Sequence, residues 1–248
     1  MNHPILNGTS THNDFFNNQW EVYQKICSQN YMEHRQFSES LNKFLTSYFQ
    51  KGFSMLDLGC GDASFTSYAL LNTTVSSYTG IDLSSAALDI ANINMTRLGL
   101  GHLQDCLSLI QGDFSELMPK LVLSKEDRFD VVLMYFSLHH LSLEEKEIVI
   151  HHIWNILKPN GVFILIDIVS QDNEDREVYI KRYLEGVRNN WPELTPEEYA
   201  CVEKHISTND FPESQKTIYG LAKKHDFTQI ENLWINSANT AQSLCLYK

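Results

Sequence analysis

The sequence predicts an α/β protein built on a mostly parallel sheet. Between residues 53 and 169, five strand-like apolar runs alternate with helix-like segments, the order that places parallel strands side by side with helices between them. Two further strand-like runs end the chain with only a loop between them, which is typical of an antiparallel hairpin. A glycine-rich loop follows the first of the five runs. The alternation and the final hairpin together define the predicted fold class.

Each element has its own signal in the sequence. The predicted strands are apolar runs bounded by turn residues, and the helix over 142–157 has a capping box made by Ser142 and Glu145. Lys-Pro-Asn-Gly at 158–161 predicts a turn. The predicted strands are 53–59, 76–83, 106–114, 128–138 and 161–169, with helices over 64–71, 84–100 and 142–157 between them.

The flanking segments are mainly helical. Residues 170–215 are polar, charged and aromatic, and Thr195, Pro196 and Glu198 mark a helix start within them. A helix over 212–227 and strands over 227–235 and 241–248 follow. We expect a single domain over 1–248, divided into an N-terminal helical cap (15–50), a cofactor-binding core (51–169), a helical lid (170–215) and a C-terminal helix with the hairpin (216–248).

Composition narrows the class of protein. The 248 residues carry a net charge of −12, with 43% hydrophobic and 20% charged residues, as in an ordinary globular protein. The negative charge disfavours nonspecific nucleic-acid binding, which needs a basic surface. Five cysteines without a C-x-x-C pair argue against disulfides and structural zinc and favour a cytoplasmic location. No run approaches the roughly 18 apolar residues of a membrane helix, and no signal peptide is expected.

The glycine-rich loop lies in Met-Leu-Asp-Leu-Gly-Cys-Gly-Asp-Ala-Ser, residues 55–64. Gly59 and Gly61 fit a dinucleotide fingerprint, but its third glycine position holds Ser64. Asp57 would repel a pyrophosphate, which prefers bare amides at a helix N-terminus. The same carboxylate suits a ligand that carries an ammonium group.

Two further acids point to an adenosine ligand. Asp82 ends the second predicted strand, 21 residues beyond Gly61, where a carboxylate accepts hydrogen bonds from a ribose diol, in NAD as in other adenosine cofactors. Asp113 could accept from an adenine amino group, and Phe114 could pack on the ring. An adenosine that carries an amino acid, such as S-adenosylmethionine, would satisfy Asp57, Asp82 and Asp113 together.

With these motifs in order, residues 45–169 resemble the class I S-adenosylmethionine-dependent methyltransferases of the small-molecule branch. Ala63 and Asp226 stand where members of this family often have glycine. The resemblance implies a Rossmann-like sheet of seven strands with an antiparallel last strand. It implies cofactor contacts from the glycine loop and the ends of strands one to four: Asp57, Gly59, Cys60, Gly61, Asp82, Leu83, Asp113, Phe114, Met134 and Tyr135.

The acceptor side is less defined by sequence. His139 follows the fourth strand, where it could take a proton from the acceptor, or could simply cap the strand. The other candidate substrate residues could equally be buried aromatics or a solvated helix face. No metal-binding spacing is found, so no metal is expected. The substrate candidates are Tyr31, His34, Arg35, His140, Tyr179 and Tyr183.

The sequence therefore predicts a methyltransferase that moves the methyl group of S-adenosylmethionine to an oxygen, nitrogen or carbon of a small molecule. One alternative is a nicotinamide-dependent oxidoreductase, which Asp57 and Ser64 disfavour. Another is a non-catalytic S-adenosylmethionine-binding module that acts through a partner. Neither nucleic acid nor a membrane is expected as a partner, and the sequence leaves the acceptor and the oligomeric state open.

Overall fold

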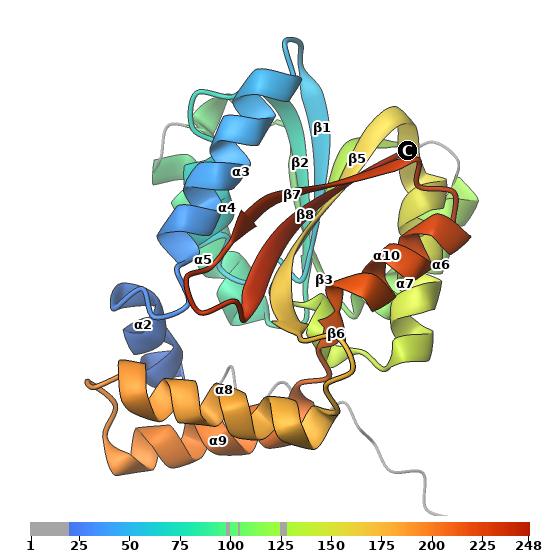
Figure 1. Cartoon of the computed structure of the whole chain (residues 1–248). Coiled ribbons are helices and arrows are strands. Elements are labelled where there is room, and N and C mark those ends of the chain that lie inside the picture. The colour runs from blue at the N-terminus through green and yellow to red at the C-terminus, as the bar shows by residue number, and fades with distance from the viewer. Residues whose placement is uncertain (1–19, 98–99, 104, 125–127) are drawn as a thin grey trace, which may run out of the picture.

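A single twisted sheet runs through the centre of the molecule (Figure 1). The computed structural model describes residues 20–97, 100–103, 105–124 and 128–248. The strand order is β3-β2-β1-β4-β5-β8-β7, and the short β6 pairs with β5 beside this path. The strands are β1 (Phe53–Leu58), β2 (Val75–Asp82), β3 (Leu107–Gln111), β4 (Phe129–Tyr135), β5 (Leu157–Ser170), β6 (Glu213–Ser214), β7 (Gln229–Ile235) and β8 (Ala241–Tyr247).

The predicted fold class is confirmed. Strands β1 to β5 pair in parallel, and β8 pairs antiparallel to both β5 and β7. The chain thus ends in the expected hairpin, with its last strand inserted between β5 and β7. The near-continuous apolar character of β4 reflects its position in the middle of the sheet, covered on both faces.

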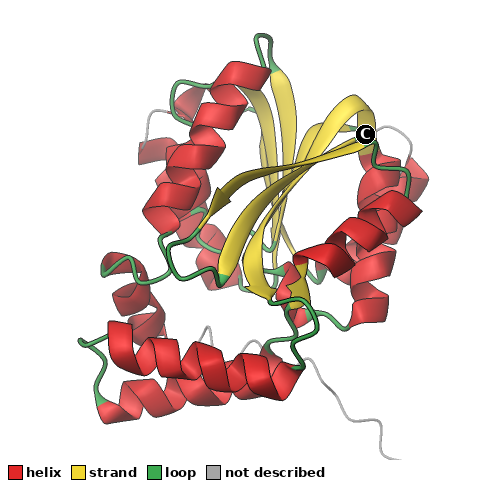
Figure 2. Ribbon diagram, in the orientation of Figure 1, coloured by secondary structure: helices red, strands yellow, loops and turns green. Residues whose placement is uncertain are grey.

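Helices cover both faces of the sheet (Figures 1 and 2). On one face, α3, α4 and α5 supply apolar side chains to a core cluster with β1, and on the other face α6, α7 and α10 do the same. Each buried aliphatic side chain contributes about 1.5–3 kcal/mol of transfer free energy. The six helices are α3 (His34–Tyr48), α4 (Ser64–Ala69), α5 (Ser85–Arg97), α6 (Phe114–Ser124), α7 (Leu143–Ile156) and α10 (Gln215–Lys224).

Three other helices lie together at the end of the sheet where the parallel strands finish (Figure 1). These are α2 (Trp20–Ser28), α8 (Arg176–Asn190) and α9 (Pro196–Asn209), and they share a separate apolar cluster. The predicted start of α9 is confirmed, because Thr195 and Glu198 form a capping box with Pro196 in the first turn. Of the predicted N-terminal helices, residues 15–19 lie outside the described residues.

Two local predictions are wrong. The predicted turn at 158–161 belongs to β5, which begins at Leu157, pairs with Phe129 and absorbs a register shift there. Sequence periodicity in the helix over 142–157 predicts one apolar stripe through Ile148, Val149, His152, Ile153 and Ile156, but Ile148 is 55% exposed. The buried residues of this helix are Lys146, Val149, Ile150, Ile153 and Ile156. Lys146 can be buried because its ammonium group pairs with the Glu213 carboxylate at 2.9 Å and the methylene groups of its side chain pack in the core.

Candidate active site

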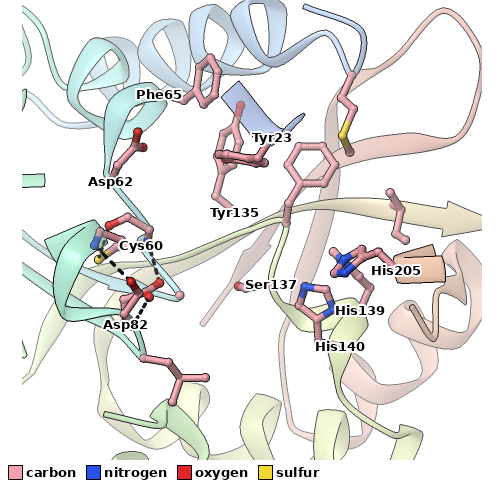
Figure 3. Close-up of a pocket in the computed structure, with 18 of the residues that line it drawn as sticks. Tyr23, Cys60, Asp62, Phe65, Asp82, Tyr135, Ser137, His139, His140 and His205 are labelled. Carbon is pink, nitrogen blue, oxygen red and sulfur yellow. Dashed lines mark hydrogen bonds between the residues drawn. The ribbon is translucent and has the colours of Figure 1, made fainter. Parts of the chain in front are cut away.

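A cavity of about 770 Å³ opens at the carboxyl ends of the parallel strands. This is the edge of an α/β sheet at which ligands generally bind. Its lining comes from the loops after β1, β2, β3 and β4 and from α2, α8 and α9. Figure 3 shows Cys60 and Asp82 on one side of the cavity and His139, His140 and His205 on the other.

The glycine loop brings its backbone to the cavity wall. Gly59 has a φ of +74°, and a Cβ there would lie 2.6 Å from Cβ of Ser137, so a side chain is excluded. Gly61 has a φ of +53°, and a Cβ there would meet no atom within 4 Å. The loop therefore packs closely on one side and leaves open space beside Gly61, as a ligand cradle requires.

Asp82 stands at the end of β2 and ties two loops together. Its Oδ2 accepts from the amide of Gly61 at 2.8 Å, and its Oδ1 accepts from the amide of Ser84 at 2.8 Å. Burial raises the pKa of this carboxyl, and the two amides oppose that rise. Each carboxylate oxygen retains a second lone pair, so Asp82 can also accept from a diol in the cavity.

The structure corrects the predicted role of Asp57. Its side chain is fully buried on β1 and does not line the cavity. Oδ2 accepts from the hydroxyls of Thr66 at 2.9 Å and Tyr78 at 2.8 Å. Burial raises the pKa of Asp57 to about 7, although these two hydroxyls lower it. Asp57 is thus a core group that braces β1, β2 and α4, and its side chain does not line the cavity.

Most of the other predicted cofactor residues line the cavity: Gly59, Cys60, Gly61, Asp82, Leu83, Asp113, Phe114 and Tyr135. The exception besides Asp57 is Met134. Its side chain is fully buried in the cluster beneath α6, α7 and α10. Successive residues of a strand point to opposite faces, so Tyr135 reaches the cavity and Met134 does not.

His139 is held between two buried carboxylates. Its Nδ1 bonds to Oδ1 of Asp167, its backbone amide donates to Oδ2 of Asp167 at 2.9 Å, and its Nε2 lies 3.7 Å from Oδ1 of Asp210. Burial lowers the pKa of His139, but the charges of Asp167 and Asp210 outweigh burial and raise it overall. Burial also raises the pKa of Asp210 to about 6, against the effect of His139.

The predicted substrate residues divide into two groups. His34, His140 and Tyr183 line the cavity, whereas Tyr31, Arg35 and Tyr179 do not. Burial lowers the pKa of His34 to about 3, which keeps it neutral, and its buried Nε2 has no hydrogen-bond partner among the described residues. An unpaired buried nitrogen on a cavity wall is available to a ligand.

The three residues outside the cavity have structural partners instead. Tyr31 stacks on Trp191 at 5.2 Å between ring centroids, and its hydroxyl accepts from the amide of Glu193. Tyr179 is fully buried against Tyr183. Arg35 is exposed and donates to the carbonyl of Ser28 at 3.0 Å. The prediction that these three contact the substrate is therefore corrected.

The cavity lining is rich in carboxylates. Among the described residues, its lining includes Asp62, Asp82, Asp113, Glu145 and Asp210 and neither lysine nor arginine. Such a wall favours neutral or cationic ligands and disfavours a phosphate, which is bound in proteins mainly by arginine, lysine or bare amides.

Comparison with known proteins identifies the fold family. Residues 56–163 match the family model described as a methyltransferase domain. This segment is therefore similar to a methyltransferase domain. The phosphoethanolamine N-methyltransferase of Plasmodium falciparum is 25% identical over 197 residues, which cover 77% of this chain and 68% of that protein. The malonyl-[acyl-carrier protein] O-methyltransferase of Priestia megaterium is 26% identical over 152 residues, or 59% of this chain and 47% of that protein.

Solved structures show the same fold. The magnesium protoporphyrin IX methyltransferase of Synechocystis, solved with bound SAM, superposes with a TM-score of 0.66 at 13% identity and full coverage of both chains. An O-methyltransferase family protein of Burkholderia thailandensis gives 0.61 at 15% identity, covering 86% of this chain and 55% of that one. This chain thus spans about two thirds of the first sequence relative and about half of several others.

The structure places further residues at or beside the cavity that the sequence did not single out. Asp167, Asp210 and His205 stand around His139, and Phe65 and Met32 line the cavity. Asp167 carried a usable signal, because it is an acid at the end of an apolar strand, as Asp82 is. Asp210 and His205 lie in the 170–215 segment, where neither spacing nor periodicity marks them.

Proposed function

We propose that this chain transfers a methyl group from S-adenosylmethionine to an oxygen of a small, largely apolar acceptor. The observation that carries the proposal is a single cavity that joins the glycine cradle and Asp82 at one end to the His139–Asp167 pair at the other. When bound, S-adenosylmethionine supplies a methyl group already activated by a positive sulfur.

The lining suits this donor. Asp82 faces the position of a ribose diol, and Asp113 with Phe114 offers an acceptor and an aromatic ring for adenine. The acidic wall matches a ligand with a sulfonium and an ammonium group. Among the described residues no lysine or arginine competes for these acids. The same features oppose a pyrophosphate, and therefore a nicotinamide dinucleotide.

The His139–Asp167 pair favours an oxygen acceptor. Methyl transfer to a hydroxyl forms a carbon–oxygen bond, breaks the carbon–sulfur bond, and releases the hydroxyl proton, which needs a base. Asp167 holds the Nδ1 proton of His139, so Nε2 carries the lone pair that can take this proton. A neutral amine could be methylated without such a base in the same step, so the pair would bring it no comparable advantage.

The acceptor half of the cavity is mostly apolar and aromatic. Tyr183 and Trp191 from the 170–215 segment face the cavity together with Met32, Ile168 and Ile206. This lining, with neither lysine nor arginine among the described residues, supports a hydroxylated aromatic acceptor more than a phosphorylated amine. In this proposal residues 170–215 cover the cavity as a lid, and the chain works as a single domain.

The described residues contain no helix that is both long and apolar enough to cross a membrane. All five cysteines are free thiols, which supports a reducing, cytoplasmic location.

The test uses the purified chain, S-adenosylhomocysteine and a panel of phenols. We expect calorimetry to show binding of S-adenosylhomocysteine, and labelled methyl groups to appear on at least one phenol. His139→Gln should keep cofactor binding and lower the transfer rate by about 10²- to 10⁴-fold. The matched variant His151→Gln, on α7 outside the cavity lining, should retain the full rate. A chain that binds NAD but not S-adenosylhomocysteine would overturn the proposal.

A further inference from the structure

One carboxylate oxygen beside the cavity is surrounded by imidazoles. Oδ1 of Asp210 is buried and accepts no hydrogen bond within the described part of the chain. Nε2 of His139 lies 3.7 Å from it, Nδ1 of His140 3.8 Å and Nε2 of His205 3.6 Å. All four residues line the cavity, and Figure 3 shows His205 of α9 on the same side of the cavity as the neighbouring His139 and His140.

Nitrogen–oxygen distances of 3.6–3.8 Å are too long for hydrogen bonds and are closer to the distance between two ligands of one metal ion. A nitrogen and an oxygen that share a hydrogen bond lie about 2.7–3.2 Å apart. Two ligands of a tetrahedral zinc ion, each about 2.0–2.1 Å from the metal, lie about 3.3 Å apart. A movement of a few tenths of an ångström would bring each histidine nitrogen to that distance from the Asp210 oxygen, and the ligand atoms of His139, His140 and Asp210 already lie within 4.8 Å of one another.

The orientation of His139 supports the same reading. Its Nδ1 is engaged by Asp167, so in the neutral ring the Nε2 lone pair faces the lone pairs of Asp210. The pair is therefore stabilised by a positive charge between Nε2 and Oδ1, which either a proton or a metal ion supplies. A carboxylate on the far nitrogen of a histidine is also the usual outer partner of a metal-ligating imidazole.

We propose that His139, His140 and Asp210 form a binding site for a divalent cation of the zinc type. Their ligand atoms lie within 4.8 Å of one another. Two imidazoles and a carboxylate suit zinc better than magnesium or calcium, which prefer oxygen ligands. The expectation of no metal rests on sequence spacing, which does not detect this group because its residues come from segments about 70 residues apart.

The backbone around the site is already in place. The amide of Phe211 donates to the carbonyl of His139 at 2.8 Å, and Arg176 donates to the carbonyl of Asp210 at 2.7 Å. These bonds hold the two segments side by side whether or not the metal is present. His140 would exchange its 3.2 Å contact with the carbonyl of Asn209 for the metal.

A metal ion bound at this site would affect catalysis. A metal on Nε2 of His139 removes the lone pair that the proposed function uses to take the acceptor proton. Zinc should therefore inhibit methyl transfer, and a chelator should restore it. This consequence rests on the proposed function, whereas metal binding itself does not.

The experiment measures binding first. The full chain is stripped with a chelator and titrated with Zn²⁺ by calorimetry and with Co²⁺ by visible absorption. We expect one metal per chain and a Co²⁺ spectrum of low-coordinate type. Asp210→Asn and His140→Gln should each weaken binding by about 10- to 100-fold while retaining S-adenosylhomocysteine binding as a sign of correct folding.

A partly buried histidine away from the cavity supplies the matched control. Nε2 of His225 lies 3.7 Å from a carboxylate oxygen of Glu147 on the outside of α7, so His225→Gln tests whether any histidine–carboxylate pair suffices. We expect this variant to bind zinc as the original chain does. Absence of Zn²⁺ and Co²⁺ binding, or binding unaffected by Asp210→Asn and His140→Gln, would overturn the site.

The two proposals fail separately. If methyl transfer is observed and no metal binds, only the metal site is wrong. If metal binds at the three residues and the metal-stripped chain transfers no methyl group, the proposed function is wrong and the site stands.

Discussion

The two ends of the cavity are built in different ways. The cofactor end uses backbone amides and single carboxylates at the tips of consecutive strands, such as Gly61 and Asp82. The acceptor end uses side chains from the N-terminal helices, the β4 and β5 ends and the 170–215 segment. The cofactor, which all such enzymes share, is thus bound by local sequence motifs. The acceptor, which differs between enzymes, is bound by a surface that distant segments form together.

The largest expected effect lies at the cofactor end. Asp82→Ala removes the acceptor for the ribose diol and leaves the Gly61 amide unpaired, so we expect S-adenosylhomocysteine affinity to fall at least about 100-fold, or roughly 3 kcal/mol. Isothermal calorimetry measures this change. Asp82→Asn, which keeps one acceptor oxygen, should lose less. An affinity within threefold of the original in Asp82→Ala would remove this residue from the site.

This end of the cavity was largely predictable from sequence. Its residues follow predicted strands directly, and the carboxyl ends of parallel strands share one edge. The exceptions have a physical cause. Asp57 and Met134 are close to the edge in sequence, but the alternation of side chains along β1 and β4 turns them into the core. The sequence predicted the correct strands, but it did not show whether each side chain points into the core or toward the cavity.

The second prediction concerns the correction at Asp57. Its folded-state pKa of about 7 lies above the ordinary value of 3.8, so the folded chain retains a proton that the unfolded chain releases. The group therefore stabilises the fold less as pH rises from about 4 to about 7. We expect the unfolding free energy of Asp57→Asn, relative to the original chain, to increase by roughly 2 kcal/mol between pH 5 and pH 7.5.

Urea unfolding at several pH values measures that difference. Asp57→Asn should change S-adenosylhomocysteine affinity by less than about threefold, because the side chain does not reach the cavity. A large loss of affinity with no pH-dependent gain in stability would return Asp57 to the cofactor site and weaken the distinction between core and cavity residues.

The acceptor end was predictable only in part. His34, His139, His140 and Tyr183 were found because of their residue type and their position next to predicted strands or in the lid. Asp210 was not, because its place beside His139 depends on how α8 and α9 fold back across the sheet. Long-range packing of this kind leaves no periodic signal in one sequence.

The third prediction tests the lid. Trp191 lines the cavity and packs against Tyr31 and Tyr183, so Trp191→Leu should weaken phenol binding about tenfold and leave cofactor affinity unchanged. Steady-state kinetics with the accepted phenol measures this as a rise in KM. Trp234→Leu, at a 39% exposed position on β7, is the matched control. Equal effects in both variants would mean that the lid does not recognise the acceptor.

The smallest effect is expected at Arg35. It follows His34 in α3, and successive helical residues point about 100° apart, so His34 faces the cavity while Arg35 reaches the carbonyl of Ser28 at the surface. Arg35→Ala should change activity by less than twofold and stability by less than about 0.5 kcal/mol. Transfer assays and urea unfolding measure both. A loss of activity above tenfold would show that the α2–α3 connection rearranges when the acceptor binds, and that the acceptor end is completed by the ligand.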